Sequence, residues 1–178
     1  SVAAVVVHEV LGHGLTAAAL GGTFRRFWVQ LDLMGAAATS SPPEHRVTVL
    51  AAGVVASTVI GALLIVLARW VRGPWLGLAL AVVAASCCHE GPPYALWNTI
   101  FDAGSGDMAR LLSLVDREHV RPWLLASSMA VLVAGTWFAH LAVFRRCEDL
   151  LGPLSRGGAI ALGVGMTLVV TLGYWVFD

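Results

Sequence analysis

His8, Glu9 and His13 place three ionisable side chains within six residues of an otherwise apolar stretch, SVAAVVVHEVLGHGLTAAALGG. An ionisable group in an apolar helix of membrane-spanning type costs at least a few kcal/mol, so it indicates function by default. Two neutral imidazoles and a third protein ligand can hold Zn²⁺ and leave a fourth position for water. A glutamate beside the first histidine can then take the proton of that water. The stretch therefore predicts a zinc centre for hydrolysis, with Glu9 as the base.

The spacing of the histidines departs from the zinc-protease pattern HExxH, because His8 and His13 are five residues apart rather than four. At about 100° per residue, they would lie about 140° apart around an ideal α-helix. In one arrangement, a π-type widening near Val10–Gly12 brings both imidazoles onto one face. In the other, Glu9 and His13 are the ligands and His8 has a different role. We favour the widening, because it keeps a base beside the metal.

The composition indicates a membrane protein of one domain. Of 178 residues, 58% are hydrophobic and 12% are charged, whereas soluble domains carry about 25% charged residues. Eleven basic and eleven acidic residues balance, which gives no reason to expect a nucleic-acid partner. We expect a single domain over residues 1–178, whose first helix begins upstream of Ser1.

Several apolar stretches approach the roughly 20 residues that a spanning helix needs. We expect an all-α, multi-pass protein of the cell membrane with about five to six transmembrane helices. The candidate spans are Ser1–Leu20, Val47–Leu67, Trp75–Trp97, Trp123–Phe144 and Gly157–Phe177. HEGPPY should break the third of these, since proline disrupts a helix interior. A short strand or hairpin is expected at Thr23–Leu33. Arginines divide almost evenly between the two sides, so orientation stays open.

A second polar stretch, NTIFDAGSGDMARLL, lies between the third and fourth apolar stretches. Irregular backbone at membrane depth is tolerated only where it is buried in protein or lines a cavity. Asp107 opens a pattern of helical periodicity, so it can aim a carboxylate at a fixed point. Asp102 is more readily explained as an ordinary turn residue.

The remaining polar residues give weaker signals. His89 and Glu90 either line a path to the metal or mark a kink before the prolines. His140, near the end of the fourth apolar stretch, is interpreted as a packing or interfacial residue rather than a ligand. The three cysteines are interpreted as small buried apolar residues; they are Cys87, Cys88 and Cys147.

HEVLGHGLTAAALGG, RVTVLAAGVVASTVIGALL and NTIFDAGSGDMARLL together resemble the motifs of the site-2 protease family, the intramembrane zinc metalloproteases of M50 type. The resemblance covers roughly residues 2–112. It implies that Asp107 is the third zinc ligand beside His8 and His13. It also implies that Asn98 helps to hold the substrate, a membrane protein or membrane-anchored peptide cleaved in or near its membrane segment. The chain departs from the family pattern in its longer histidine spacing and in lacking the proline after Asn98.

One alternative function belongs to a different class. A catalytically inactive relative would use the same polar cavity to bind a partner helix or a metal without cleavage, and the longer histidine spacing favours it. An iron-dependent membrane oxidase would need several paired histidine motifs, whereas the six histidines here are scattered.

Overall fold

The computed structural model describes residues 1–29, 35–101 and 106–153, and also residues 155, 157, 158, 161, 164 and 165. Within them the chain is mostly helical, with one small sheet. The elements are α1 (Val2–Val6), the π-helix η1 (Val7–Gly14), α2 (Leu15–Ala19), β1 (Thr23–Val29), β2 (Gly35–Ser40), the short 3₁₀ helix η2 (Pro43–His45), α3 (Arg46–Trp70), α4 (Pro74–Phe101), α5 (Asp107–Leu114) and α6 (Arg117–Leu151). The predicted fold class, all-α with a small β element, is confirmed.

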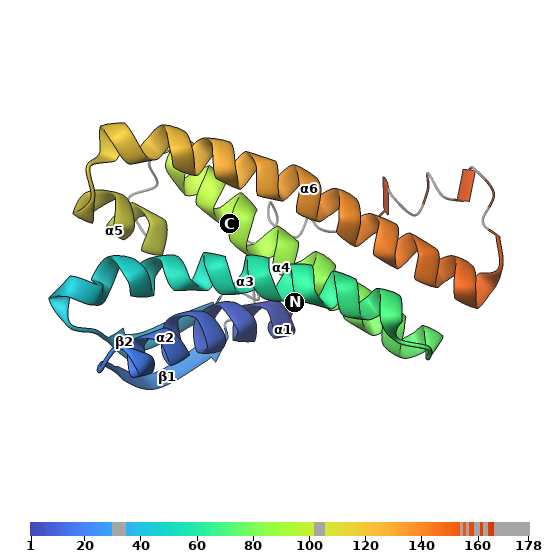
Figure 1. The fold of residues 1–178 in the computed structure, drawn as a ribbon, viewed down its shortest axis with the longest axis horizontal. Coiled ribbons are helices and arrows are strands. Elements are labelled where there is room, and N and C mark those ends of the chain that lie inside the picture. Colours follow the sequence, from blue (N-terminus) through green and yellow to red (C-terminus); the bar gives the residue numbers. More distant parts are fainter. Residues whose placement is uncertain are drawn as a thin grey trace.

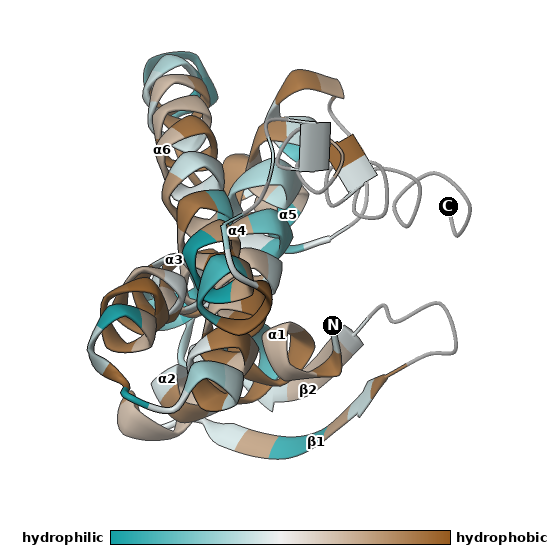
Figure 2. Cartoon of the chain, turned by 90° about the vertical axis from the view of Figure 1, so that its right-hand side faces the viewer, coloured by the Kyte–Doolittle hydropathy of each residue, from teal (hydrophilic) through white to brown (hydrophobic). Residues whose placement is uncertain are grey.

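The long helices form a stack that the hairpin closes on one side (Figure 1). α4 packs against both α3 and α6. The first helical run, α1–η1–α2, packs against α3 on the side away from α6. The hairpin β1–β2 covers the outer side of that run (Figure 2). The His-Glu-His stretch is therefore enclosed between α3 and the hairpin.

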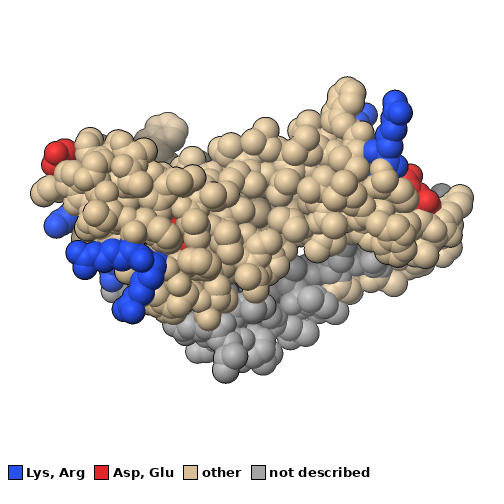
Figure 3. Space-filling view, turned by 90° about the horizontal axis from the view of Figure 1, so that it is seen from below, with Lys and Arg blue, Asp and Glu red and all other residues tan. Residues whose placement is uncertain are grey.

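Length, hydropathy and charge all fit a membrane protein. Three helical stretches of the described chain are long and apolar enough to cross a bilayer, namely Val2–Ala19, Pro43–Trp70 and Arg117–Leu151. At 1.5 Å per residue, α6 is about 52 Å long, which exceeds the roughly 30 Å hydrocarbon core. On the face shown in Figure 3, charged side chains gather towards the two ends, and few are visible between them. Most of the fifth predicted span, Gly157–Phe177, lies outside the described residues.

The prediction that HEGPPY breaks the third span is wrong. α4 runs without interruption from Pro74 to Phe101 and contains Pro92 and Pro93. Proline fixes φ near −65°, which is itself a helical value, although its missing N–H costs a bond. Gly91 packs tightly on α3, where an added Cβ would lie 3.1 Å from Ser57 Cβ and 3.1 Å from the Val54 carbonyl oxygen. This tertiary contact outweighs the free-energy cost of the missing hydrogen bonds, and α4 continues past the prolines and through Asn98.

Small residues let the helices approach closely. Gly53, Ser57 and Gly61 recur every four residues on the buried face of α3, a pattern typical of helix pairs in lipid. A Cβ on Gly12 of η1 would lie 2.6 Å from Gly53 Cα, so these backbones touch. On the same face, a Cβ on Gly61 would lie 3.1 Å from the Cys88 sulfur of α4. α3 is therefore held against η1 and α4 at backbone distance.

The hairpin confirms the predicted extended element in part. β1 and β2 pair antiparallel, from Thr23 opposite Ser40 to Val29 opposite Gly35. Residues 30–34 lie outside the described chain. The second strand, GAAATS, consists mainly of Gly and Ala, which have weak strand propensity, and this is why the sequence did not predict it. Pairing with β1 and packing against η1 fix it instead.

Arg146 of α6 closes the far end of the stack. Its guanidinium donates to the carbonyl oxygens of Ala68 and Val71, the latter at 2.9 Å, and pairs with Asp149 at 2.9 Å. The last carbonyls of a helix have no partner within it, so Arg146 satisfies the end of α3. Gly77 of α4 leaves the room, because a Cβ there would lie 2.6 Å from Arg146 Nε.

Replacing Arg146 by Met should lower the free energy of unfolding by about 1–3 kcal/mol, because buried carbonyls lose charged donors. The change is measurable as a lower midpoint of thermal unfolding in detergent. Arg145→Met, at the exposed neighbouring position, is the control and should have little effect. Equal midpoints for the two variants would show that Arg146 does not hold the helix end.

Candidate metal centre

The π-helix η1 resolves the spacing of the histidines. All eight residues Val7–Gly14 are π-helical, so one turn holds about one residue more than in an α-helix. The rings of His8 and His13 lie 5.0 Å apart between centroids, with an angle of 72° between their planes. The predicted widening near Val10–Gly12 is confirmed, and it extends over the whole motif.

Hydrogen bonds at Nδ1 orient the two imidazoles. His13 Nδ1 lies 2.7 Å from the carbonyl oxygen of Val49 on α3. Because a carbonyl only accepts, this Nδ1 carries the proton and Nε2 keeps its lone pair, as in many metal-binding histidines. His8 Nδ1 lies 3.4 Å from the Ser57 hydroxyl, also on α3. The hydroxyl can accept from His8 Nδ1, and in that tautomer the Nε2 atoms of both rings can face a common ligand.

The two Nε2 atoms converge beside Gly53. A Cβ at Gly53 would clash with His8 Nε2 and would lie 2.6 Å from His13 Nε2. The absent side chain thus leaves space at the point where both lone pairs meet. The same glycine touches Gly12, so one position of α3 serves both the helix contact and the site.

Glu9 completes a compact cluster. The donor atoms of His8, Glu9 and His13 all lie within 4.8 Å of one another, and the three side chains are buried. The backbone of Ala37 on β2 hydrogen-bonds to the Glu9 carboxylate. Gly35 of the same strand packs on Glu9, where an added Cβ would lie 3.2 Å from its Cγ. The hairpin therefore fixes the carboxylate beside the imidazoles.

Asp107 reaches the same cluster from α5. Its Oδ2 lies 3.0 Å from His13 Nε2. The Tyr94 hydroxyl on α4 accepts a hydrogen bond of 2.9 Å from the Asp107 backbone N–H. Gly106 approaches the same hydroxyl so closely that a Cβ would clash with it, and its φ of 97° favours glycine. Tyr94 thus anchors the start of α5 and places the carboxylate.

Contacts along α5 fix the position of the Asp107 carboxylate. The apolar face of α5 is buried through Met108 and Leu111, which pack around Ala95 of α4. The helix is therefore held at its start by a hydrogen bond and along its length by apolar contacts.

The donor set fits a zinc ion. His13 Nε2 is buried and lacks a hydrogen-bond partner, although Asp107 Oδ2 lies 3.0 Å away. Two ligands of a tetrahedral zinc ion lie about 3.4 Å apart at the usual bond lengths. A separation close to this value, with poor hydrogen-bond geometry, is expected for two atoms that share an ion. Two imidazoles and a carboxylate also match the ligand types that zinc takes in hydrolases.

Asn98 lies one turn beyond Tyr94 on α4. It is 6% exposed, and its side-chain N–H donates to the Tyr94 carbonyl oxygen at 2.9 Å. Its Oδ1 lies on the side of Gly106, 3.7 Å from where a Cβ would be. Asn98 is therefore beside the start of α5, and its substrate-binding role stays a prediction. Asp102 lies outside the described residues.

Three residues that orient the site were not singled out from the sequence. Ser57 hydrogen-bonds to His8, and Tyr94 accepts from the Asp107 backbone and packs against His8, with 6.0 Å between the ring centroids. Gly53 was visible only as part of a family-like AAGVV stretch. The recurrence of Gly53, Ser57 and Gly61 every four residues was the signal that could have marked this face of α3 as a close helix contact.

Comparison with known proteins agrees with the geometry. A family model described as Peptidase M50B-like matches residues 1–161, a range that includes every residue of the cluster. No curated protein and no solved structure matches the chain. The resemblance to the site-2 protease family is confirmed by this match.

Replacing Gly53 by Ala should abolish metal binding, because the new methyl group would occupy the point where the two Nε2 atoms converge. Metal content of the purified protein, measured by atomic emission, tests this. Gly61→Ala is the matched control on the same face of α3, since its methyl group would meet only Cys87, Cys88 and Ala84. A Gly53→Ala protein that keeps its metal would place the ion elsewhere.

Deleting Leu11 converts HEVLGH to HEVGH and should preserve metal binding. The π segment absorbs one extra residue, so its removal returns the segment to α-helix without turning the flanking helices. Leu11 is 39% exposed, so little core is lost. Metal content and thermal unfolding of the deletion variant test the idea. Loss of the metal in a folded protein would show that the wider turn itself is required.

Proposed function

Because the chain belongs to the Peptidase M50B-like family, we propose that it is a zinc-dependent intramembrane protease. It hydrolyses a peptide bond within or near a membrane-embedded segment of its substrate. The observation that carries this proposal is the convergence of the two imidazole Nε2 atoms beside Gly53, with two carboxylates next to them.

We assign His8, His13 and Asp107 as the zinc ligands and Glu9 as a neighbour that does not ligate. Two imidazoles and one carboxylate leave a position open for water. Zinc, when bound, supplies a Lewis acid that activates water and polarises the scissile carbonyl. Val49 supports this ligand set because its carbonyl fixes the tautomer of His13.

Glu9 handles the proton. It directly follows His8, it is buried, and its carboxylate is fixed by the Ala37 backbone. A carboxylate in this place takes a proton from the attacking water and returns it to the leaving amine. Because hairpin and helix both restrain it, its position changes little between these two steps.

The substrate segment must be extended to expose its peptide bond, since helical backbone in lipid is fully hydrogen-bonded. β2 lies against η1 and touches Glu9 through Gly35. An extended peptide can add to the edge of such a sheet by main-chain hydrogen bonds. Asn98 offers an amide oxygen beside Gly106, at the start of α5.

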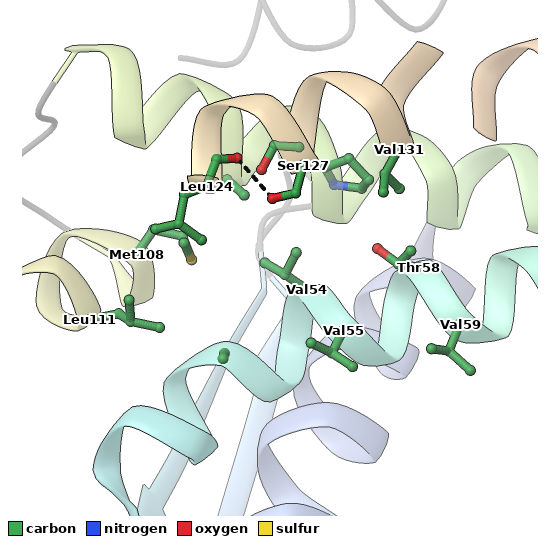
Figure 4. A pocket seen from close by; sticks show the side chains of 13 residues that line it. Val54, Val55, Thr58, Val59, Met108, Leu111, Leu124, Ser127 and Val131 are labelled. Atoms are coloured by element: carbon green, nitrogen blue, oxygen red, sulfur yellow. Dashed lines mark hydrogen bonds between the residues drawn. The ribbon is translucent and has the colours of Figure 1, made fainter. Parts of the chain in front are cut away.

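An apolar pocket next to α5 suits the flanking part of a membrane substrate. Its volume is about 260 Å³, and it lies between α3, α4, α5 and α6 (Figure 4). Val54, Val59, Leu124 and Val131 are among its apolar lining residues. Met108, which also lines it, directly follows Asp107. Apolar side chains of a substrate can therefore be buried in a pocket whose lining includes Met108, the residue that follows the proposed ligand Asp107.

The lipid bilayer is the second partner of the chain. We propose that it is a multi-pass protein of the cell membrane, in which α1–η1–α2, α3 and α6 cross the bilayer. The apolar middle of the molecule between two charged ends supports this placement (Figure 3). The metal centre then lies within the membrane, in a protein interior that excludes lipid.

Replacing Glu9 by Gln should leave the metal bound and lower the rate of peptide hydrolysis about 10²-fold or more, because only the base is removed. Purified protein in liposomes is incubated with a set of single-span peptides that carry a tag at each end. Cleavage is followed by separation of the tags, and metal content is measured on the same samples.

Glu44→Gln, in the exposed η2, is the control and should cleave at the normal rate. Cleavage by Glu9→Gln at the normal rate would remove Glu9 from the chemistry. A zinc-loaded wild-type protein that cleaves none of the peptides would favour the inactive, partner-binding alternative.

A further inference from the structure

The hydroxyl group of Tyr94 accepts hydrogen bonds, but its own proton meets no acceptor within the described residues. Its oxygen accepts from the backbone N–H groups of Asp107 and Met108, the former at 2.9 Å. A phenol can donate one hydrogen bond in addition to those that it accepts. One hydrogen-bond donor of Tyr94 is therefore left for a ligand.

This hydroxyl borders the metal centre. It lies 2.9 Å from the backbone nitrogen of Asp107, whose carboxylate in turn lies 3.0 Å from His13 Nε2. The Tyr94 ring meets the His8 ring at 86°, with 6.0 Å between the ring centroids. The phenol also interacts electrostatically with the carboxylates of both Asp107 and Glu9. The free donor is therefore placed among the proposed ligands and the proposed base.

Gly106 leaves the hydroxyl uncovered. A Cβ on Gly106 would clash with the Tyr94 hydroxyl oxygen, and the same Cβ would lie 3.7 Å from Asn98 Oδ1. Asn98 donates its side-chain N–H to the Tyr94 carbonyl oxygen, so its amide presents an acceptor towards Gly106. A donor and an acceptor thus border one point that has no side chain. A peptide group needs this combination, because it carries one C=O and one N–H.

Resting on the proposed peptidase function, we propose that Tyr94 is a further catalytic residue, whose hydroxyl donates a hydrogen bond to the oxyanion formed at the scissile carbonyl. The water oxygen bonds to the carbonyl carbon, the π electron pair moves onto the carbonyl oxygen, and Glu9 takes a proton from the water. When the C–N bond breaks, the carbonyl re-forms and Glu9 gives this proton to the leaving amine. Tyr94 keeps its own proton throughout.

The fixed position of the hydroxyl suits this role. A donor that is already in place stabilises the charge that develops in the transition state more than it stabilises the neutral substrate carbonyl. The two hydrogen bonds from Asp107 and Met108 hold the Tyr94 oxygen in place. Hydrogen bonds in a chain polarise one another, so these two bonds also make the hydroxyl a stronger donor.

Replacing Tyr94 by Phe in the full chain should lower kcat about 10²-fold or more, with little change in KM, because only transition-state stabilisation is lost. Cleavage is measured at a zinc concentration that saturates both proteins, and equal metal content is verified on the same samples. Thr99→Val is the control, since it removes a buried hydroxyl of the same helix that donates to the Ala95 carbonyl. It should cleave at the normal rate.

A binding measurement separates oxyanion stabilisation from the positioning of Asp107. A phosphinic peptide, whose tetrahedral phosphorus carries the charge of the intermediate, should bind about 10²-fold more weakly to Tyr94→Phe in calorimetry. The parent peptide should bind equally to Glu9→Gln and to Glu9→Gln/Tyr94→Phe. Slow cleavage with unchanged phosphinic-peptide affinity would reduce Tyr94 to a positioning residue and would overturn the proposal.

Equal kcat for the wild-type protein and Tyr94→Phe would overturn this inference alone. A zinc-loaded wild-type protein that cleaves no peptide would overturn the proposed function, and this inference with it. If Tyr94→Phe fails to fold or to hold zinc, 3-fluorotyrosine at position 94 keeps the accepting oxygen and is a stronger donor. It should bind the phosphinic peptide more tightly than the wild-type protein, and unchanged affinity would contradict the proposed donor role.

Discussion

The contact between Gly12 of η1 and Gly53 of α3 is the constraint on which the site depends. Two glycine backbones touch there, and each neighbouring feature needs that distance. It brings His13 Nδ1 to the Val49 carbonyl and His8 to Ser57. It also leaves a space beside Gly53 where both Nε2 atoms meet. Larger residues would separate the helices and leave the imidazoles without partners on α3.

A buried polar cluster in so apolar a chain costs free energy, and the chain lowers this cost mainly with backbone groups. Main-chain carbonyls hydrogen-bond to His13, His89 and His140, and a main-chain group restrains Glu9. The side chains that orient the cluster are chiefly Ser57 and Tyr94. Backbone groups carry no net charge, so they orient the buried donors without adding further ions to the protein interior.

Much of the fold and of the candidate site could be predicted from the sequence, because long apolar runs and the polar residues that interrupt them are strong signals. The π-helix followed from a single spacing, since His8 and His13 can share a face only if the turn widens. α3 was found close to its predicted range, and α6 contains its predicted range but extends beyond it at both ends, because long apolar runs specify the middle of a helix better than its ends. Failures arose where tertiary contacts decide. Packing at Gly91 carries α4 through Pro92 and Pro93, and pairing with β1 makes a strand of GAAATS. Tyr94 was missed because its role exists only when α5 folds back on α4.

The separation of Asp107 from the histidines along the chain would give a metal ion bound by them a mechanical role. An ion bound to His13 and Asp107 would act as a crosslink between the first helical run and α5. It would close a loop of about 90 residues. A covalent crosslink across such a loop lowers the entropy of the unfolded chain and thereby stabilises the folded state by about 4–5 kcal/mol. The apo chain would therefore be prone to local opening at α5, the short helix that Tyr94 and a few apolar side chains hold. A chelator would then unfold the region around α5 alone, and a protease would cut the chain there first.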